Sequence, residues 1–154
     1  MSKVVVFPGS FDPFTKGHEE IVNRGLEIFD KVIIAIGENS QKNYLFSLES
    51  RIQHIASIFE GMENVEIKSF TGLTVDFVSA QNTNLILRGL RNSSDFNFER
   101  TIAQMNHEIK DVESVFLMTT PELSAINSSV IRDIKKNGGD ISKFVTNDHF
   151  LAYN

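Results

Sequence analysis

The segment from Pro8 to His18 brings together groups that suit phosphate binding. It reads Pro-Gly-Ser-Phe-Asp-Pro-Phe-Thr-Lys-Gly-His and joins an apolar run to an amphipathic pattern. Gly9 and Gly17 let the backbone approach a ligand closely, and Ser10 adds a hydroxyl and its own N–H. His18 falls in the first turn of the expected helix, where free N–H groups and the helix dipole attract phosphate. A donor imidazole there can hold the oxygens of a reacting phosphorus, so His18 is the expected catalytic residue.

An ordinary β–α loop with a helix-capping histidine is the simpler interpretation of this segment. A lone Gly-His pair would favour it. The whole string favours a ligand site, because two glycines, two prolines, an Asp and the His occur together. The string has neither Gly-x-Gly-x-x-Gly nor Gly-Lys-Ser/Thr, so it fits neither a dinucleotide fingerprint nor a P-loop.

Two further polar segments follow other apolar runs. The first is Arg88-Gly89-Leu90-Arg91, whose two guanidinium forks can hold phosphate oxygens, although a solvated arginine pair is a common alternative. The second is Leu123-Ser124-Ala125-Ile126-Asn127-Ser128-Ser129. Serines at a helix start are typical of an N-cap, and the same N–H groups and hydroxyls can also bind a triphosphate.

Short apolar runs alternate with helical patterns along the chain. The runs are continuous and rich in Val and Ile, which is typical of strands buried on both faces: Val4–Phe7, Val32–Ile36, Val65–Ile67, Leu85–Leu87 and Val115–Met118. Five β–α repeats predict an α/β fold with a doubly wound, Rossmann-like, five-stranded parallel sheet. With strand order 3-2-1-4-5, the order reverses between the first and fourth strands, where ligands bind. Segments 8–18 and 88–95 would then face each other.

Five helical patterns separate the runs. The first has its apolar stripe at Ile21, Val22, Leu26 and Phe29, and the second begins after Ser47 as an N-cap. The third covers about Leu73–Ala80, and the fifth begins near Ser128. The fourth follows Asn92 and is expected to pack inward through Phe96, Ile102, Met105 and Ile109. A short C-terminal helix is expected around Asn147–Ala152.

The composition is that of a soluble globular protein, with 154 residues, 41% hydrophobic and 23% charged, and predicts a single domain over residues 1–154. The absence of cysteine excludes a disulfide scaffold, a thiolate metal site and a cysteine nucleophile. A net charge of -5 argues against a nucleic-acid binder but leaves room for a local anion site. No apolar run approaches the ~20 residues of a membrane span, and the N-terminus does not read as a signal peptide. We therefore expect a cytoplasmic protein with no membrane partner.

The residues of these segments also match a known pattern. The opening strand, Gly-Ser-Phe-Asp-Pro and Thr-x-Gly-His resemble the nucleotidyltransferase superfamily, which shares a short His-containing signature with class I aminoacyl-tRNA synthetases. Arg88–Arg91 followed by Asp95, Phe96 and Glu99 is similar to the branch whose acceptor is 4′-phosphopantetheine. Thr15 stands where related cytidylyltransferases and pyridine-nucleotide adenylyltransferases usually have His. The second signature, Ile-Ser-Ser-Ser/Thr, is matched with two departures, Asn127 for its first serine and Leu123 where some members carry Trp.

This resemblance, which covers the whole chain, implies transfer of the adenylyl group of ATP to 4′-phosphopantetheine by in-line attack. We expect Mg²⁺ to bridge phosphates there, with few protein ligands and several waters. It implies that the acceptor contacts Ser10, Lys42, Thr74 and Arg88. It implies that ATP contacts Ser10, Phe11, His18, Gly89, Leu90, Arg91, Glu99 and the segment Leu123, Ser124, Ala125, Ile126, Asn127, Ser128 and Ser129. A homo-hexamer and feedback inhibition by coenzyme A are implied as well.

Two alternatives stay open on the sequence. One is a different nucleotidyltransferase, which would use CTP or nicotinamide mononucleotide. The other is a nucleotide-sensing module that binds ATP and catalyses nothing. The presence of Lys42 and Arg88, a second anion site beside the expected ATP site, favours an enzyme over a sensor.

Overall fold

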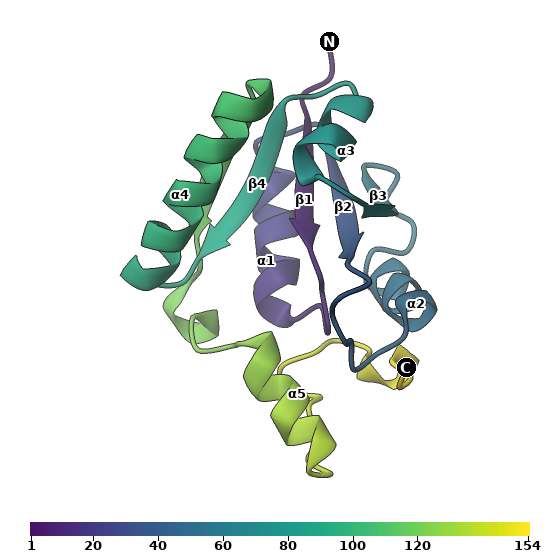
Figure 1. The fold of residues 1–154 in the computed structure, drawn as a ribbon. Helices are drawn as coiled ribbons and strands as arrows, with labels where there is room; N and C mark the ends of the chain where they lie inside the picture. The colour runs from purple at the N-terminus through teal and green to yellow at the C-terminus, as the bar shows by residue number, and fades with distance from the viewer.

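The computed structural model describes residues 1–154 and contains one five-stranded sheet. Its strands are β1 (Val4–Gly9), β2 (Lys31–Glu38), β3 (Val65–Thr71), β4 (Leu85–Leu90) and β5 (Glu113–Met118). All neighbours pair in parallel in the order β3-β2-β1-β4-β5, so the predicted order is confirmed. The carboxyl ends therefore share one edge of the sheet, the lower edge in Figure 1.

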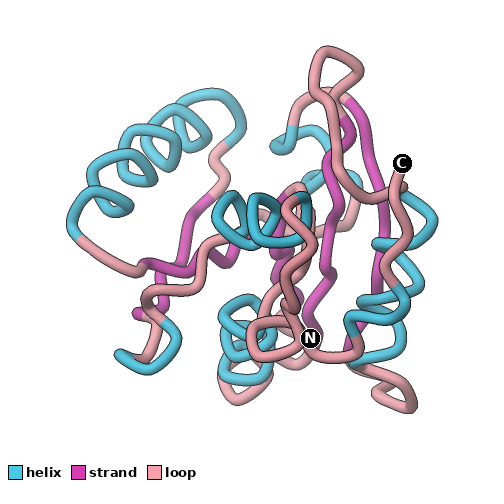
Figure 2. The backbone as a smooth tube through the Cα atoms, turned by 90° about the horizontal axis from the view of Figure 1, so that it is seen from below, coloured by secondary structure: helices cyan, strands magenta, loops and turns pink.

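The helices are distributed over both faces of the sheet, as predicted. They are α1 (Lys16–Gly25), α2 (Leu48–Ile58), α3 (Thr74–Ala80), α4 (Ser93–Lys110) and α5 (Ser128–Lys136), with 3₁₀ turns at Pro121–Leu123 and Asp148–Phe150. Helices α1 and α2 cover one face, while α3 and α4 lie on the other (Figure 1). Helix α5 lies beyond the carboxyl edge, the end from which Figure 2 views the molecule. None of the helices is long and apolar enough to cross a membrane.

The central strands are buried on both faces because successive side chains point to opposite sides. Val5 and Phe7 pack with residues of α1 and α2, whereas Val6 packs with residues of α3. The same prediction is wrong for β3 and β5, in which no residue is fully buried. Both are edge strands of the sheet, so each has a neighbouring strand on one side only.

Helix α4 contradicts the predicted inward packing of its apolar residues. The exposed fractions are 44% for Phe96, 39% for Ile102, 56% for Met105 and 51% for Ile109. The only buried residue of α4 is Glu99. The helix packs against the outer part of the sheet, β4 and β5, and against the short α3, so these elements cover only part of its circumference.

Two further helix predictions need correction. Helix α1 ends at Gly25, so Leu26 and Phe29 lie beyond it. A Cβ on Gly25 would come within 2.8 Å of a Leu87 methyl, which shows how closely α1 approaches β4. The expected C-terminal helix is only the 3₁₀ turn Asp148–Phe150.

Candidate active site

The site lies where the strand order reverses, between β1 and β4. These strands pair only through Val6 and Ile86, and they diverge toward their carboxyl ends (Figure 1). Two adjoining cavities of about 370 and 360 Å³ open there. Six residues line both cavities: Pro8, Gly9, Ser10, Lys42, Arg88 and Glu99. The fold therefore brings segments 8–18 and 88–95 together, as the sequence predicted.

Most of the predicted site residues border these cavities. The first cavity is lined by Ser10, Phe11, His18, Lys42, Arg88, Gly89, Arg91, Glu99, Leu123, Ile126, Asn127, Ser128 and Ser129. Thr74 lines the second cavity only. Three predicted residues border neither: Leu90, Ser124 and Ala125. Leu90 is buried in the sheet, and the Ser124 hydroxyl turns back to donate to the Pro121 carbonyl.

His18 is held by the start of its own helix. Thr15 is the N-cap of α1 and forms a capping box with His18. The Thr15 N–H donates to His18 Nδ1 at 2.9 Å, and the His18 N–H donates to Thr15 Oγ1 at 3.3 Å. Because Nδ1 accepts, the neutral ring carries its proton on Nε2. The sequence analysis treated helix capping and ligand binding as alternative roles for this histidine. In the structure Nδ1 caps the helix, and the Nε2–H group remains to bind a ligand.

The surroundings of His18 keep the ring uncharged. Its centroid lies 5.1 Å from that of Phe11 and 5.3 Å from that of Phe14. Burial lowers the pKa of His18 to about 3, and the positive charges of Arg88 and Arg91 act in the same direction. At neutral pH the side chain is therefore a neutral hydrogen-bond donor through Nε2.

The two arginines of the 88–91 segment each face a carboxylate. Arg88 donates from Nε and Nη2 to both Glu99 oxygens, at 2.9 and 2.6 Å, and from Nη1 to the Pro8 carbonyl. Arg91 donates to both Asp95 oxygens at 3.0 and 3.2 Å. Burial alone would raise the pKa of Asp95, but the hydrogen bonds from Arg91 outweigh it and lower the pKa. Arg91 also donates from Nη1 to the Ile126 carbonyl at 3.4 Å, so every nitrogen of both arginines is held within the protein. One N–H on each terminal nitrogen is left to donate to a ligand.

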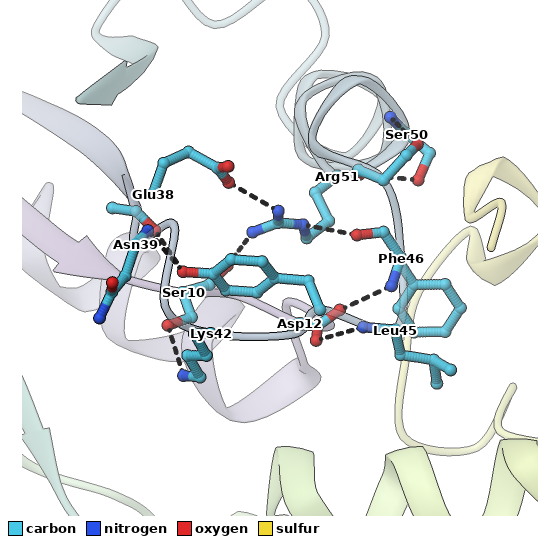
Figure 3. Close-up of polar contacts among 12 residues, drawn as sticks. Ser10, Asp12, Glu38, Asn39, Lys42, Leu45, Phe46, Ser50 and Arg51 are labelled. Carbon is cyan, nitrogen blue, oxygen red and sulfur yellow. Dashed lines mark hydrogen bonds and ion pairs between the residues drawn. The ribbon is translucent and has the colours of Figure 1, made fainter. Parts of the chain in front are cut away.

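Ser10 and Lys42 meet although 32 positions separate them. The Lys42 Nζ donates to Ser10 Oγ at 3.1 Å, as Figure 3 shows. Ser10 follows β1, and Lys42 lies in the loop after β2. Both side chains stand at the common wall of the two cavities.

The start of α5 differs in detail from the predicted serine cap. Asn127 is the N-cap, and its side chain accepts from the N–H groups of Ser129 and Val130 at 2.8 and 3.4 Å. The Ser128 hydroxyl instead donates to the Pro13 carbonyl at 3.0 Å. The second signature segment is thus joined directly to the first.

The sequence analysis assigned no individual role to Arg132, Asp12 or Arg51. Arg132 lines the first cavity and donates to the Asp12 carbonyl at 2.8 Å and to Ser129 Oγ at 3.1 Å. Asp12 also lines the first cavity although it is almost fully buried, and Arg51 is buried beside the site. A signal existed for Arg51, which falls on the same face of its helix as the apolar Leu48 and Ile55.

The chain is similar to known proteins in sequence and in fold. The family model described as cytidylyltransferase-like matches residues 6–134. The chain is 54% identical over 146 residues to the phosphopantetheine adenylyltransferase of Cytophaga hutchinsonii, covering 94% of this chain and 97% of the relative. It is 46% identical over 140 residues to the protein of that name from Flavobacterium johnsoniae, covering 91% and 92%.

Solved structures share the fold. A bifunctional NMN adenylyltransferase/ADP ribose pyrophosphatase from Francisella tularensis superposes with a TM-score of 0.66 at 22% identity, over 99% of this chain and 47% of that one. The same enzyme complexed with AMP and a Mn ion also gives 0.66, at 21% identity. At such identities the likeness concerns the fold alone.

Proposed function

Because the chain belongs to the cytidylyltransferase-like family and, within it, to the phosphopantetheine adenylyltransferases, we propose that its two adjoining cavities hold the two substrates of an adenylyl transfer. The enzyme transfers the adenylyl group of ATP to 4′-phosphopantetheine, giving dephospho-coenzyme A and pyrophosphate. The observation that carries the site assignment is the common wall, where Ser10, Lys42 and Arg88 border both cavities. Neither a CTP- or NMN-dependent transferase nor a non-catalytic ATP sensor has comparable support.

ATP occupies the first cavity in this proposal. That cavity contains His18 near the start of α1 and Asn127, Ser128 and Ser129 at the start of α5, so two helix N-termini face a polyphosphate. Arg91 adds a positive charge on the same wall. The acceptor lies in the second cavity, which Thr74 borders, with its phosphate at Ser10, Lys42 and Arg88.

The reaction needs little chemistry from side chains. The acceptor phosphate attacks the α-phosphorus of ATP in line, and pyrophosphate leaves without a covalent intermediate. The nucleophile is already an anion, so no general base is needed, and the chain contributes positioning and charge stabilisation. His18 donates from Nε2 to an oxygen of the α-phosphoryl group, where negative charge grows during transfer.

Mg²⁺ fits this site as an ion bound to the phosphates of ATP rather than to protein side chains. No group of three or more His, Asp or Glu side chains is arranged to hold a metal. The carboxylates on the first cavity are engaged elsewhere, Asp95 and Glu99 with arginines and Asp12 with backbone N–H groups. Mg²⁺ would be held by phosphate oxygens and water and would neutralise phosphate charge there.

The protein is also proposed to be a cytoplasmic homo-hexamer inhibited by coenzyme A. The exposed apolar residues of α4, including Phe96 and Met105, support self-association because water contact with such a face is unfavourable. Coenzyme A contains the pantetheine and adenylate parts of the product and would compete for both cavities. Analytical ultracentrifugation tests the hexamer, and inhibition kinetics with coenzyme A test the regulation.

Product analysis tests the proposed function. The protein is mixed with Mg²⁺, ATP or CTP, and either 4′-phosphopantetheine or nicotinamide mononucleotide. Dephospho-coenzyme A and pyrophosphate are expected only from ATP with 4′-phosphopantetheine. Faster pyrophosphate release with another pair, or binding of ATP without any turnover, would contradict the proposal.

A further inference from the structure

Arg51 is a buried charge beside the site that no step of the proposed reaction uses. Its side chain is 1% exposed, on the first turn of α2. A buried guanidinium is costly unless its N–H groups are satisfied. Here Nε donates to the Phe46 carbonyl at 3.1 Å, Nη1 to the Ser10 carbonyl at 2.7 Å and Nη2 to Glu38 at 2.8 Å (Figure 3).

These three acceptors belong to three different parts of the site. Ser10 lies in the loop after β1, Glu38 ends β2, and Phe46 ends the loop that carries Lys42. A planar guanidinium presents donors in several fixed directions, whereas a lysine ammonium on its flexible stem cannot reach three separated acceptors at once. Arg51 thus fixes the positions of these segments relative to one another.

A second path leads from Arg51 to Lys42 through Tyr44. The guanidinium carbon lies 4.4 Å from the centre of the Tyr44 ring. The Tyr44 hydroxyl accepts from the Asn39 N–H at 2.9 Å. Asn39 in turn begins the tight turn that presents Lys42, since its carbonyl accepts from the Lys42 N–H at 3.0 Å. The position of Lys42 therefore depends on a ring that packs against Arg51.

Asp12 provides an independent connection between the same two loops. Its carboxylate accepts from the N–H groups of Leu45 and Phe46 at 2.9 and 3.0 Å (Figure 3). This connection does not involve the guanidinium. A change at Arg51 should therefore shift Ser10 and Lys42 without releasing the whole loop.

We propose that Arg51 is a positioning residue that sets the spacing of Ser10 and Lys42 at the common wall of the two cavities, and thereby the binding of the acceptor phosphate. This inference rests on the proposed function, because it takes Ser10 and Lys42 as the acceptor's phosphate site. Arg51 itself touches neither substrate and acts through these two residues.

The test variant is Arg51→Lys, which keeps the charge but loses the three-way contact. The KM for 4′-phosphopantetheine should rise on the order of tenfold, as expected when a binding group is displaced by about an ångström or less. The Kd for ATP, measured by titration without acceptor, should change by less than about twofold. A merely structural role would lower the amount of folded enzyme, so kcat would fall while both constants stayed unchanged.

Two further variants sharpen the result. Ile55→Val removes one methyl group from a buried side chain of the same helix without touching the network, so it controls for lost stability. Lys42→Ala provides a double-mutant cycle. If Arg51 acts largely through Lys42, Arg51→Lys should cost less than about threefold in that background, because contacting residues are not additive.

The outcomes separate the two proposals. If wild type makes no dephospho-coenzyme A, the proposed function fails and this inference fails with it. If wild type is active, additive losses in the cycle, or an unchanged acceptor KM in Arg51→Lys, overturn the positioning role alone.

Should Arg51→Lys not fold, Glu38→Gln replaces it. This variant removes the negative charge that faces Arg51 Nη2 but keeps an oxygen that can accept its hydrogen bond. Glu38→Gln should raise the KM for 4′-phosphopantetheine about twofold to fivefold, and its effect should likewise be non-additive with Lys42→Ala. An unchanged KM would overturn the positioning role.

Discussion

The two signature loops at the carboxyl edge differ sharply in how firmly they are held. In the first loop Phe11, Asp12, Phe14 and Thr15 are each less than 5% exposed. In the second, from Thr119 to Ser129, no residue is buried. Both loops lead into a helix N-terminus that faces the first cavity, yet only the first is packed like a protein core.

Their hydrogen bonds differ in the same way. The first loop is held along its length, by the Thr15–His18 capping box, by Asp12 and by Arg51. The second is joined to the rest of the molecule mainly near its ends, where Thr120 donates to Glu20 and Ser128 donates to Pro13. We infer that the first loop is preorganised around the reacting phosphorus, while the second adjusts to ATP as it binds.

The largest effect is expected at His18. Removing its ring in His18→Ala should lower kcat by about 10²–10³, as loss of one preorganised donor does elsewhere, with a smaller change in the KM of either substrate. Steady-state kinetics with both substrates measure this split. Asn23→Ala, an exposed position on the same helix, is the matched control and should retain wild-type kcat. A His18→Ala enzyme with wild-type kcat would show that the first loop is not the catalytic one.

The next effect concerns the rigidity of the first loop. The Asp12 side chain is only 3% exposed and accepts from the N–H groups of Leu45 and Phe46. Asp12→Ala leaves both N–H groups without an acceptor. Each of the two lost partners costs about 1–3 kcal/mol, so the free energy of unfolding should fall by about 2–6 kcal/mol. Urea unfolding measures this loss. Asp12→Asn, which keeps one acceptor oxygen, should lose about half as much. Equal stability in all three proteins would remove the contrast between the loops.

The fold was largely predictable because its strands differ from its helices in pattern. The Val- and Ile-rich runs are strands in the predicted order, and the segments 8–18 and 88–95 meet as expected. The exposure of the apolar residues of α4 was not predictable. The helical spacing of Ile102 and Met105 indicates that one face of the helix is apolar, but it does not indicate which element covers that face.

The site was predictable where a residue's type alone suggests a ligand. His18 and Arg91 fall in this class, and both line the first cavity. The roles of Arg51 and Arg132 were not predicted, because these side chains donate to backbone carbonyls of distant segments, at Ser10 and Asp12. A carbonyl is present at every position of the chain, so no residue pattern marks such a contact before the fold is known.

A smaller effect should appear in the pH dependence of stability. The pKa of His18 is about 3 in the folded chain, against 6.5 for the free side chain. Between these values the unfolded chain binds a proton that the folded chain does not, so stability is complete above pH 6.5 and declines as the pH falls. The decline is at most about 1.4 kcal/mol per pH unit for one proton. His18→Gln should flatten the slope of the unfolding free energy between pH 6.5 and 5. An unchanged slope would mean that the first loop does not hold the ring uncharged.

The smallest effect is expected at the second loop. Asn127→Ala removes the cap of α5, which accepts from Ser129 and Val130, and should cost about 1 kcal/mol of stability. Because no residue of this loop is buried, we expect ATP binding to weaken by only a few fold, while kcat stays near wild type. Asn127→Ser is the matched control, since serine and asparagine cap about equally well, and it should match wild type in denaturation and in ATP titration. A loss of kcat in Asn127→Ala as large as that of His18→Ala would mean that the second loop is as preorganised as the first, and that burial does not distinguish their roles.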